Sequence, residues 1–291
     1  MKARTSPELS NDEFELLRRL VEERTGILVS ERKSYLIASR FASLLEEEGV
    51  DTFAELYTRA RAAAPDGPLM DRIVDAITTN ETLWFRDDGP WHILRTALLP
   101  RYCAELSQGR RNRVRIWSAA CSTGQEPYSV AMTIREFIQD EGLVSVKPEA
   151  FEIVATDISP QALEIARRGT YDQMAASRGL PPQYAERFFE SSGSTIEVVP
   201  AIKSMVRFQR FNLQQSFALL GRFDLILCRN VLIYFSNELK LEIFRKIASA
   251  LCPEGALILG GSESAQGATR LFQMVRSGRH LYYTARLEQE R

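Results

Sequence analysis

The chain reads VRIWSAA at 114–120, PYSVAMTIREFIQ at 127–139 and FEIVATDI at 151–158, so that short apolar runs alternate with a longer amphipathic one. The same alternation continues through PQALEIARRG at 160–169 and FDLILCRN at 223–230. Short apolar runs predict strands, and the amphipathic runs between them predict helices. A repeated strand–helix order predicts an α/β fold, in which helices cover a mostly parallel sheet.

The region before this series has a helical pattern. Apolar residues recur there at steps of three and four, as at Phe14, Leu17 and Leu20. Ser10 or Asn11 is expected to cap the first helix at its start, because acidic residues follow in the first turn. Thr25-Gly26 is expected to end that helix.

These patterns divide the chain into two domains. We expect a helical N-terminal domain over 1–78 and an α/β domain over 79–291. Within the second domain, residues 181–211 alternate only partly and carry a Ser-Gly turn. This segment predicts a small antiparallel β element inserted into the α/β domain.

Composition excludes several classes of function. The 37 basic and 38 acidic residues leave no net field for a polyanion, so we expect no nucleic-acid partner. Four scattered cysteines and two histidines do not form a metal-binding pattern, so we expect no metal and reduced thiols. Residues 1–14 have no apolar signal-like stretch, and no apolar run approaches a membrane span. We therefore expect a cytoplasmic protein without direct membrane insertion.

In an open α/β sheet, ligands bind outside the carboxyl ends of the strands. The first informative turn is 118–126, SAACSTGQE, whose small residues allow a ligand to approach the backbone. A dinucleotide site would have a G-x-G-x-x-G pattern, which is absent. The acidic Glu126 at the start of the next helix favours a cationic ligand over an anionic one.

Two further turns carry polar residues. Asp157 ends the second strand, where a carboxylate accepts hydrogen bonds from ribose hydroxyls; the alternative, a helix cap ahead of Pro160, is about equally supported. Asn230 and Tyr234 follow a later strand, although a plain strand end with a core aromatic residue fits them too. Residues 78–87, TTNETLWFRD, join the two domains and concentrate polar, aromatic and cationic side chains. The alternative to a ligand-binding role is a purely structural one, as a helix cap with an apolar anchor.

Taken together, four motifs resemble the CheR family, the protein-glutamate O-methyltransferases of bacterial chemotaxis. The motifs are TTNETLWFRD at 78–87, WSAACSTGQEPYS at 117–129, ATDIS at 155–159 and LCRNVLIYF at 227–235. The resemblance extends over nearly the whole chain, and it implies a Rossmann-like methyltransferase domain with a small β-subdomain. Rival interpretations are a methyltransferase with another acceptor, a non-catalytic scaffold and, least supported, a nicotinamide oxidoreductase.

The resemblance implies S-adenosylmethionine as cofactor, with S-adenosylhomocysteine as product. Glu126 would then pair with the ammonium group of the cofactor, Asp157 would bind its ribose, and Asn212 with Leu213 would flank its adenine. The family's cofactor-binding positions correspond here to Asn80, Thr82, Arg86, Glu126, Asp157, Asn212, Leu213, Asn230 and Val231.

By the same resemblance, Arg86 and Tyr234 are the catalytic residues. Arg86 would orient the incoming carboxylate through guanidinium hydrogen bonds, and Tyr234 would donate from its hydroxyl. The alternative for Arg86 is a plain ion pair with Asp87, Asp88 or Glu126.

The implied partners are the cytoplasmic domains of methyl-accepting chemotaxis receptors. Their glutamate side chains would become methyl esters for sensory adaptation, and the enzyme is expected to be a monomer. In this family the helical domain helps to dock the receptor, often through a basic face. The second helix of this chain keeps Arg40 but carries Glu46, Glu47 and Glu48 where that face would continue.

Overall fold

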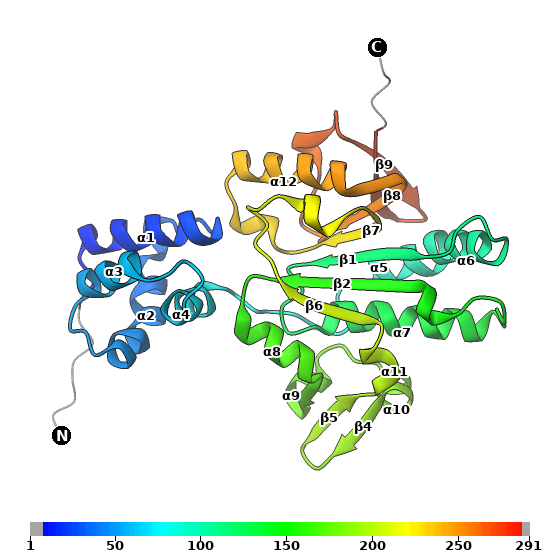
Figure 1. The fold of residues 1–291 in the computed structure, drawn as a ribbon, viewed down its shortest axis with the longest axis horizontal. Helices are drawn as coiled ribbons and strands as arrows, with labels where there is room; N and C mark the ends of the chain where they lie inside the picture. The colour runs from blue at the N-terminus through cyan, green and yellow to red at the C-terminus, as the bar shows by residue number, and fades with distance from the viewer. Residues whose placement is uncertain (1–7, 287–291) are drawn as a thin grey trace.

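The computed structural model describes residues 8–286, which fold as a helical unit beside a larger α/β unit. Figure 1 shows the helical unit, in blue to cyan, next to the carboxyl ends of the central parallel strands. A separate small sheet lies on the other side of the α/β unit from the C-terminal strands. No helix within 8–286 is long and apolar enough to cross a membrane.

The helical unit has a core of its own. The helices are α1 (Asn11–Thr25), the short 3-10 helix η1 (Glu31–Lys33), α2 (Ser34–Glu48), α3 (Phe53–Ala62) and α4 (Pro68–Ile77). Their apolar faces meet around Leu17, Ile37 and Leu56, which are fully buried. Ser10 caps α1 in a reciprocal capping box with Glu13, and Gly26 ends it at φ 77°, as the sequence predicted.

The main sheet has seven strands in the order β6-β2-β1-β7-β8-β10-β9. The strands are β1 (Val114–Ala119), β2 (Phe151–Asp157), β6 (Val206–Arg210), β7 (Phe223–Cys228), β8 (Leu251–Leu259), β9 (Phe272–Ser277) and β10 (His280–Ala285). The first five strands of this order pair in parallel, and the β9–β10 hairpin joins β8 antiparallel. The prediction of a mostly parallel α/β sheet is therefore confirmed.

Helices connect and cover the sheet strands. They are α5 (Asp88–Ile93), the π-helical turn η2 (Leu94–Leu98), α6 (Leu99–Ser107), α7 (Gln125–Asp140), α8 (Pro160–Arg168), α11 (Pro200–Lys203) and α12 (Asn237–Ala250). Four short 3-10 turns lie between these elements: η3 (Pro148–Ala150), η4 (Phe217–Leu220), η5 (Leu232–Tyr234) and η6 (Gln266–Ala268). One core contains β1 residues Val114 and Ile116 with side chains from α7, and a second contains Trp117 with side chains from α12.

The small sheet differs in extent from the predicted insert 181–211. It contains β3 (Thr170–Asp172), β5 (Thr195–Val198) and β4 (Phe189–Ser192) in that order, with α9 (Gln173–Ser177) and α10 (Pro182–Phe188) between the first strand and the hairpin. The antiparallel β4–β5 hairpin is present as expected.

Strand β6, at the end of the predicted insert, belongs instead to the main sheet, where it pairs in parallel with β2. Its alternating sequence VRFQR also suits a sheet-edge strand, because Val206 and Phe208 pack on the core while Arg207 between them is exposed. The sequence also missed β3, which has only three residues directly after the turn at Gly169.

Several polar contacts fix the helical unit against the α/β unit. The Asp75 carboxylate of α4 accepts a 2.6 Å hydrogen bond from the Ser159 hydroxyl at the start of α8. Arg210 of β6 forms a 2.6 Å ion pair with Asp71. The Leu28 amide donates to the Tyr234 carbonyl oxygen at 2.9 Å. The helical unit is thereby held over the carboxyl ends of the strands.

The separate core of the helical unit makes a stability prediction. We expect Leu17→Ala to lower the free energy of unfolding by about 2–5 kcal/mol, because Leu17 is fully buried and truncation leaves a cavity. Leu219→Ala is the matched control, since Leu219 is 97% exposed, and it should change stability by no more than about 0.5 kcal/mol. Urea unfolding followed by circular dichroism measures both, and equal stabilities for the two variants would contradict the assigned core.

Candidate active site

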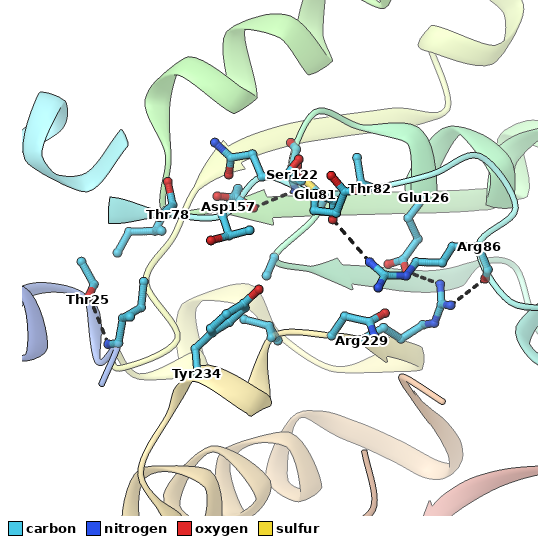
Figure 2. Close-up of a pocket in the computed structure, with 18 of the residues that line it drawn as sticks. Thr25, Thr78, Glu81, Thr82, Arg86, Ser122, Glu126, Asp157, Arg229 and Tyr234 are labelled. Atoms are coloured by element: carbon cyan, nitrogen blue, oxygen red, sulfur yellow. Dashed lines mark hydrogen bonds and ion pairs between the residues drawn. The ribbon is translucent and has the colours of Figure 1, made fainter. Parts of the chain in front are cut away.

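A cavity opens at the carboxyl ends of β1, β2 and β7, where the strand order reverses on either side of β1. This is where open α/β sheets bind ligands. The cavity opens to solvent, and its wall is mixed, with apolar side chains beside a few polar and charged ones, as in many ligand sites. Figure 2 shows side chains from these strand ends, from residues 78–86 and from the end of α1 converging on it.

The turn after β1 brings the backbone close to the cavity. Ala120 and Ser122 line it at φ 57° and 52°, a left-handed conformation that non-glycine residues rarely adopt. Gly124 lies at φ 96° and faces away from the cavity, since a Cβ there would lie 2.9 Å from the Cβ of Ala166 on α8. The glycine of this motif therefore serves helix packing, whereas Ala120 and Ser122 bring the backbone to the cavity.

Asp157 lies at the end of β2 and lines the cavity with a side chain that is almost fully buried. Its two carboxylate oxygens accept hydrogen bonds from the amides of Ser122 at 2.7 Å and Ser159 at 2.9 Å. Burial raises the pKa of Asp157, and these backbone hydrogen bonds oppose the shift. The helix-cap alternative is wrong, because the Ser159 hydroxyl caps α8 by accepting from the Ala162 amide.

Residues 78–87 cross the cavity without regular secondary structure. Trp84 anchors this segment: its ring is buried between Tyr171 and Phe189, and its indole nitrogen donates to the Ala175 carbonyl at 3.0 Å. The Ser122 hydroxyl donates to the Asn80 carbonyl at 2.9 Å. The apolar anchor of the alternative interpretation is present, without a side-chain cap on α5 from Asp87. The same segment also lines the cavity through Asn80, Thr82 and Arg86.

Arg229 is a central residue of the site that the sequence analysis missed. Its guanidinium is 2% exposed and donates to Glu126 at 2.8 Å, to Asp87 at 2.8 Å and to the Arg86 carbonyl at 2.6 Å. Glu126, which was expected to face a ligand ammonium group, also accepts from the Ser118 hydroxyl at 2.7 Å. Glu126 lines the cavity, but it shares its charge with Arg229.

Arg86 has a different environment. Among the salt bridges of residues 8–286, none involves Arg86, so the predicted alternatives of pairing with Asp87, Asp88 or Glu126 are not seen. Among the described residues its guanidinium has one hydrogen bond, to the Glu81 carbonyl at 3.4 Å, and it points into the cavity in Figure 2. The structure therefore presents a cation without a carboxylate partner at the cavity wall.

Residues 230–235 form the opposite wall. Asn230 has φ 58°, Val231 lines the cavity, and the Tyr234 side chain points into it with its hydroxyl (Figure 2). The helical unit contributes Thr25 and Ile27 from the end of α1, close to this loop. Sequence patterns do not indicate these two contributors, because their place depends on the packing of the two units.

Two predicted site residues do not line this cavity. The Asn212 side-chain amide donates to the Arg24 carbonyl at 2.8 Å and lies in a neighbouring depression between the two units. Leu213 is buried in the core next to α12. Both follow β6, the edge strand next to β2, and their role at the adenine stays a prediction.

The two cysteines beside the site are packing residues in this structure. Cys121 and Cys228 are buried, and burial raises the pKa of both thiols well above the usual range. A protonated buried thiol is a poor nucleophile at neutral pH. Within residues 8–286 there is also no cluster of three or more histidine, cysteine or acidic residues that could hold a metal ion.

Comparison with known proteins agrees with this geometry. The CheR methyltransferase all-alpha domain matches residues 12–78, and the CheR methyltransferase SAM binding domain matches residues 80–281. The chain belongs to the CheR methyltransferase family. It is accordingly an S-adenosylmethionine-dependent methyltransferase, and the predicted resemblance is confirmed.

Curated relatives cover almost the whole chain. The Pseudomonas putida chemotaxis protein methyltransferase Cher2 is 44% identical over 277 residues, which is 95% of this chain and 98% of the relative. Chemotaxis protein methyltransferase 1 of Pseudomonas aeruginosa is 43% identical over 95% of this chain and 99% of its own. A chemotaxis protein methyltransferase of Vibrio parahaemolyticus is 42% identical over 96% and 98%.

The cavity of this CheR protein fits S-adenosylmethionine by the chemistry of its lining. A buried carboxylate, Asp157, is available to ribose hydroxyls, and a second carboxylate, Glu126, lies near the end of β7. Apolar side chains such as Ile27, Val231 and Phe235 complete the wall. Pockets of this mixed kind, apolar with a few placed polar groups, are typical of cofactor sites.

The contrast between the two arginines gives a second prediction. Arg229→Met should lower the free energy of unfolding by about 3–5 kcal/mol, because it leaves Glu126 and Asp87 without their buried partner. Arg86→Met should stay within about 0.5 kcal/mol of the wild type, since no ion pair is lost. Chemical denaturation of the two variants tests this, and a large loss in the Arg86 variant would show that Arg86 has a structural role.

Proposed function

We propose that this enzyme transfers the methyl group of S-adenosylmethionine to glutamate side chains of methyl-accepting chemotaxis receptors, forming glutamyl methyl esters for sensory adaptation. One observation carries the proposal. The half-buried guanidinium of Arg86 has no carboxylate partner within the described chain and lies at the cavity wall with the Tyr234 hydroxyl. A cation and a hydroxyl donor together are suited to bind an acceptor carboxylate.

The cofactor roles follow from the cavity lining. We assign the ribose hydroxyls to Asp157, whose carboxylate is already fixed by two backbone amides. We propose that Glu126, which also pairs with Arg229, binds the ammonium group of the cofactor. Other residues of the wall would make the remaining contacts with the cofactor. These remaining residues are Asn80, Thr82, Asn230 and Val231, with Asn212 and Leu213 near the adenine.

The reaction needs little chemistry from side chains. When bound, S-adenosylmethionine supplies a methyl group on a positively charged sulfur, which becomes a neutral thioether. A glutamate carboxylate has a reference pKa near about 4.3 and is ionised at neutral pH, so no general base is required. The residues of the chain therefore act by alignment: Arg86 holds one acceptor oxygen, Tyr234 donates to the acceptor, and the surrounding wall excludes water.

The receptor is proposed to dock across the cavity mouth, where the helical unit and the α/β unit meet. Arg40 does not form a free basic surface, because it donates to the carbonyls of Ile77 and Thr78 at the end of α4. Glu47 and Glu48 pair with Arg72 within the helical unit. Because the proposed acceptor lies on cytoplasmic receptor domains, we place the enzyme in the cytoplasm. We also propose that it acts as a monomer.

Cofactor binding provides the first test. Asp157→Ala should weaken S-adenosylhomocysteine binding by about 10-fold or more, since charge-assisted hydrogen bonds contribute about 1.5–3 kcal/mol. Isothermal titration calorimetry measures the affinity. Asp140→Ala, at the exposed end of α7, is the control and should bind as the wild type does. Unchanged affinity in the Asp157 variant would remove this residue from the cofactor site.

Methyl transfer tests the acceptor site. Arg86→Lys and Tyr234→Phe should each lower kcat by about 100-fold, because each removes an oriented donor at the acceptor. Transfer of labelled methyl groups to a purified receptor cytoplasmic domain measures this, with base-labile label showing methyl esters. Tyr57→Phe on α3, which does not line the cavity, is the control. Full activity in both site variants would contradict the proposed acceptor site.

A further inference from the structure

The loop after β7 is held by a carboxylate that does not line the cofactor cavity. Glu263 lies in the turn after β8 and accepts three backbone hydrogen bonds with its two oxygens. The amide donors belong to Asn230 at 2.6 Å, Leu232 at 2.9 Å and Gly260 at 2.9 Å. No salt bridge within residues 8–286 involves Glu263, and in this part of the chain its carboxylate is hydrogen-bonded to backbone amides alone.

These contacts hold the start of the loop, because the loop's own backbone hydrogen bonds lie further along: the amides of Tyr234 and Phe235 donate to the carbonyls of Val231 and Leu232 at 3.2 Å and 3.1 Å. Asn230 adopts φ 58°, and this turn directs its amide, with that of Leu232, toward the same carboxylate. Hydrogen bonds from amides to an ionised carboxylate are stronger than those to a neutral acceptor. One side chain therefore fixes both ends of a stretch that carries Val231 to the cavity wall and leads directly to Tyr234.

Gly260 shows how closely the two loops fit. A Cβ at this position would lie 2.7 Å from the Glu263 carboxylate and 2.9 Å from both the backbone and side-chain nitrogens of Asn230. Gly260 does not have a positive φ, so its backbone conformation would accept alanine. The space for the carboxylate, and not the backbone conformation, is thus what requires glycine here.

We infer that Glu263 is a positioning residue for methyl transfer: its carboxylate clamps the amides of residues 230 and 232 and so sets the place of Tyr234 and of the cavity wall. The inference rests on the proposed function, in which Tyr234 faces the acceptor. It assigns Glu263 no contact with cofactor or acceptor.

The test compares three variants. Glu263→Gln keeps the shape but offers one carbonyl oxygen for three amides, and Glu263→Ala removes the acceptor entirely. Gly260→Ala leaves Glu263 in place but adds a methyl group that would displace its carboxylate. Asp224→Asn is the control for destabilisation, because Asp224 is also a buried carboxylate that accepts a backbone amide, that of Arg115, and in addition pairs with Arg111, but at the opposite end of β7.

Hydrogen exchange of the loop amides reports the clamp directly, without any need for activity. We expect exchange at residues 230 and 232 to rise at least 10-fold in Glu263→Ala and Gly260→Ala, and less in Glu263→Gln. With a receptor cytoplasmic domain as substrate, kcat should fall about 10-fold in Glu263→Gln and further in Glu263→Ala. The KM for the receptor should change less than twofold, and Asp224→Asn should leave both loop exchange and kcat near wild-type values.

The outcomes separate the two proposals. Unchanged loop exchange in Glu263→Ala, or raised exchange with unchanged kcat, would overturn the positioning role. If kcat fell as much in Asp224→Asn as in Glu263→Ala, general destabilisation would explain the loss of activity. That result would also overturn the positioning role of Glu263. Inactivity of the wild type on receptors would refute the proposed function. In that case, amide exchange at residues 230 and 232 and the affinity of the variants for S-adenosylhomocysteine would show whether Glu263 orders the cavity wall.

Discussion

The buried guanidinium of Arg229 joins the parts from which the cavity is built. It stands at the end of β7 and contacts the first turn of α7 through Glu126 and the connecting segment through Asp87 and the Arg86 carbonyl. Breaking a buried ion pair costs more than forming it contributes, because the remaining charge stays buried without a partner. The net attraction of these ion pairs therefore stabilises the arrangement less than the free-energy cost of leaving one of the charges buried and unpaired. Its Nε lacks a hydrogen-bond partner among the described residues, so this constraint is itself imperfectly satisfied.

A second constraint is backbone conformation. Five of the six non-glycine residues with positive φ in the described chain lie at or next to the cavity; they are Phe85, Asp87, Ala120, Ser122 and Asn230. Such conformations cost on the order of 1–3 kcal/mol each and persist only where the surroundings enforce them. Here the surroundings are identifiable: Asp157 holds the Ser122 amide, Glu263 holds the Asn230 amide, and Trp84 anchors the segment of Phe85.

The sequence predicted those features that depend on local pattern. Strand–helix alternation gave the parallel sheet, and Ser10 with Gly26 gave the limits of α1. Eight of the predicted site residues line one cavity because each follows a strand end or lies in the connecting segment. Other features depend on which elements become neighbours in space. Pattern alone could not assign β6 to the main sheet, and no signal distinguished Arg229 or Glu263 from other charged residues.

The charges of the cavity show why the division of roles among its arginines is physically reasonable. Arg229 is neutralised by Glu126 and Asp87, so it stabilises the wall but cannot attract an anion strongly. Arg86 keeps its charge available, and a half-buried cation interacts with an approaching carboxylate more strongly than an exposed one, because the effective dielectric constant is lower. Asp157 lies on the far side of the cavity from Arg86 in Figure 2, and the two side chains form no ion pair with each other. The lining thus combines two carboxylates, Asp157 and Glu126, with the guanidinium of Arg86, which has no carboxylate partner among residues 8–286; this combination suits a cationic ligand beside an anionic acceptor.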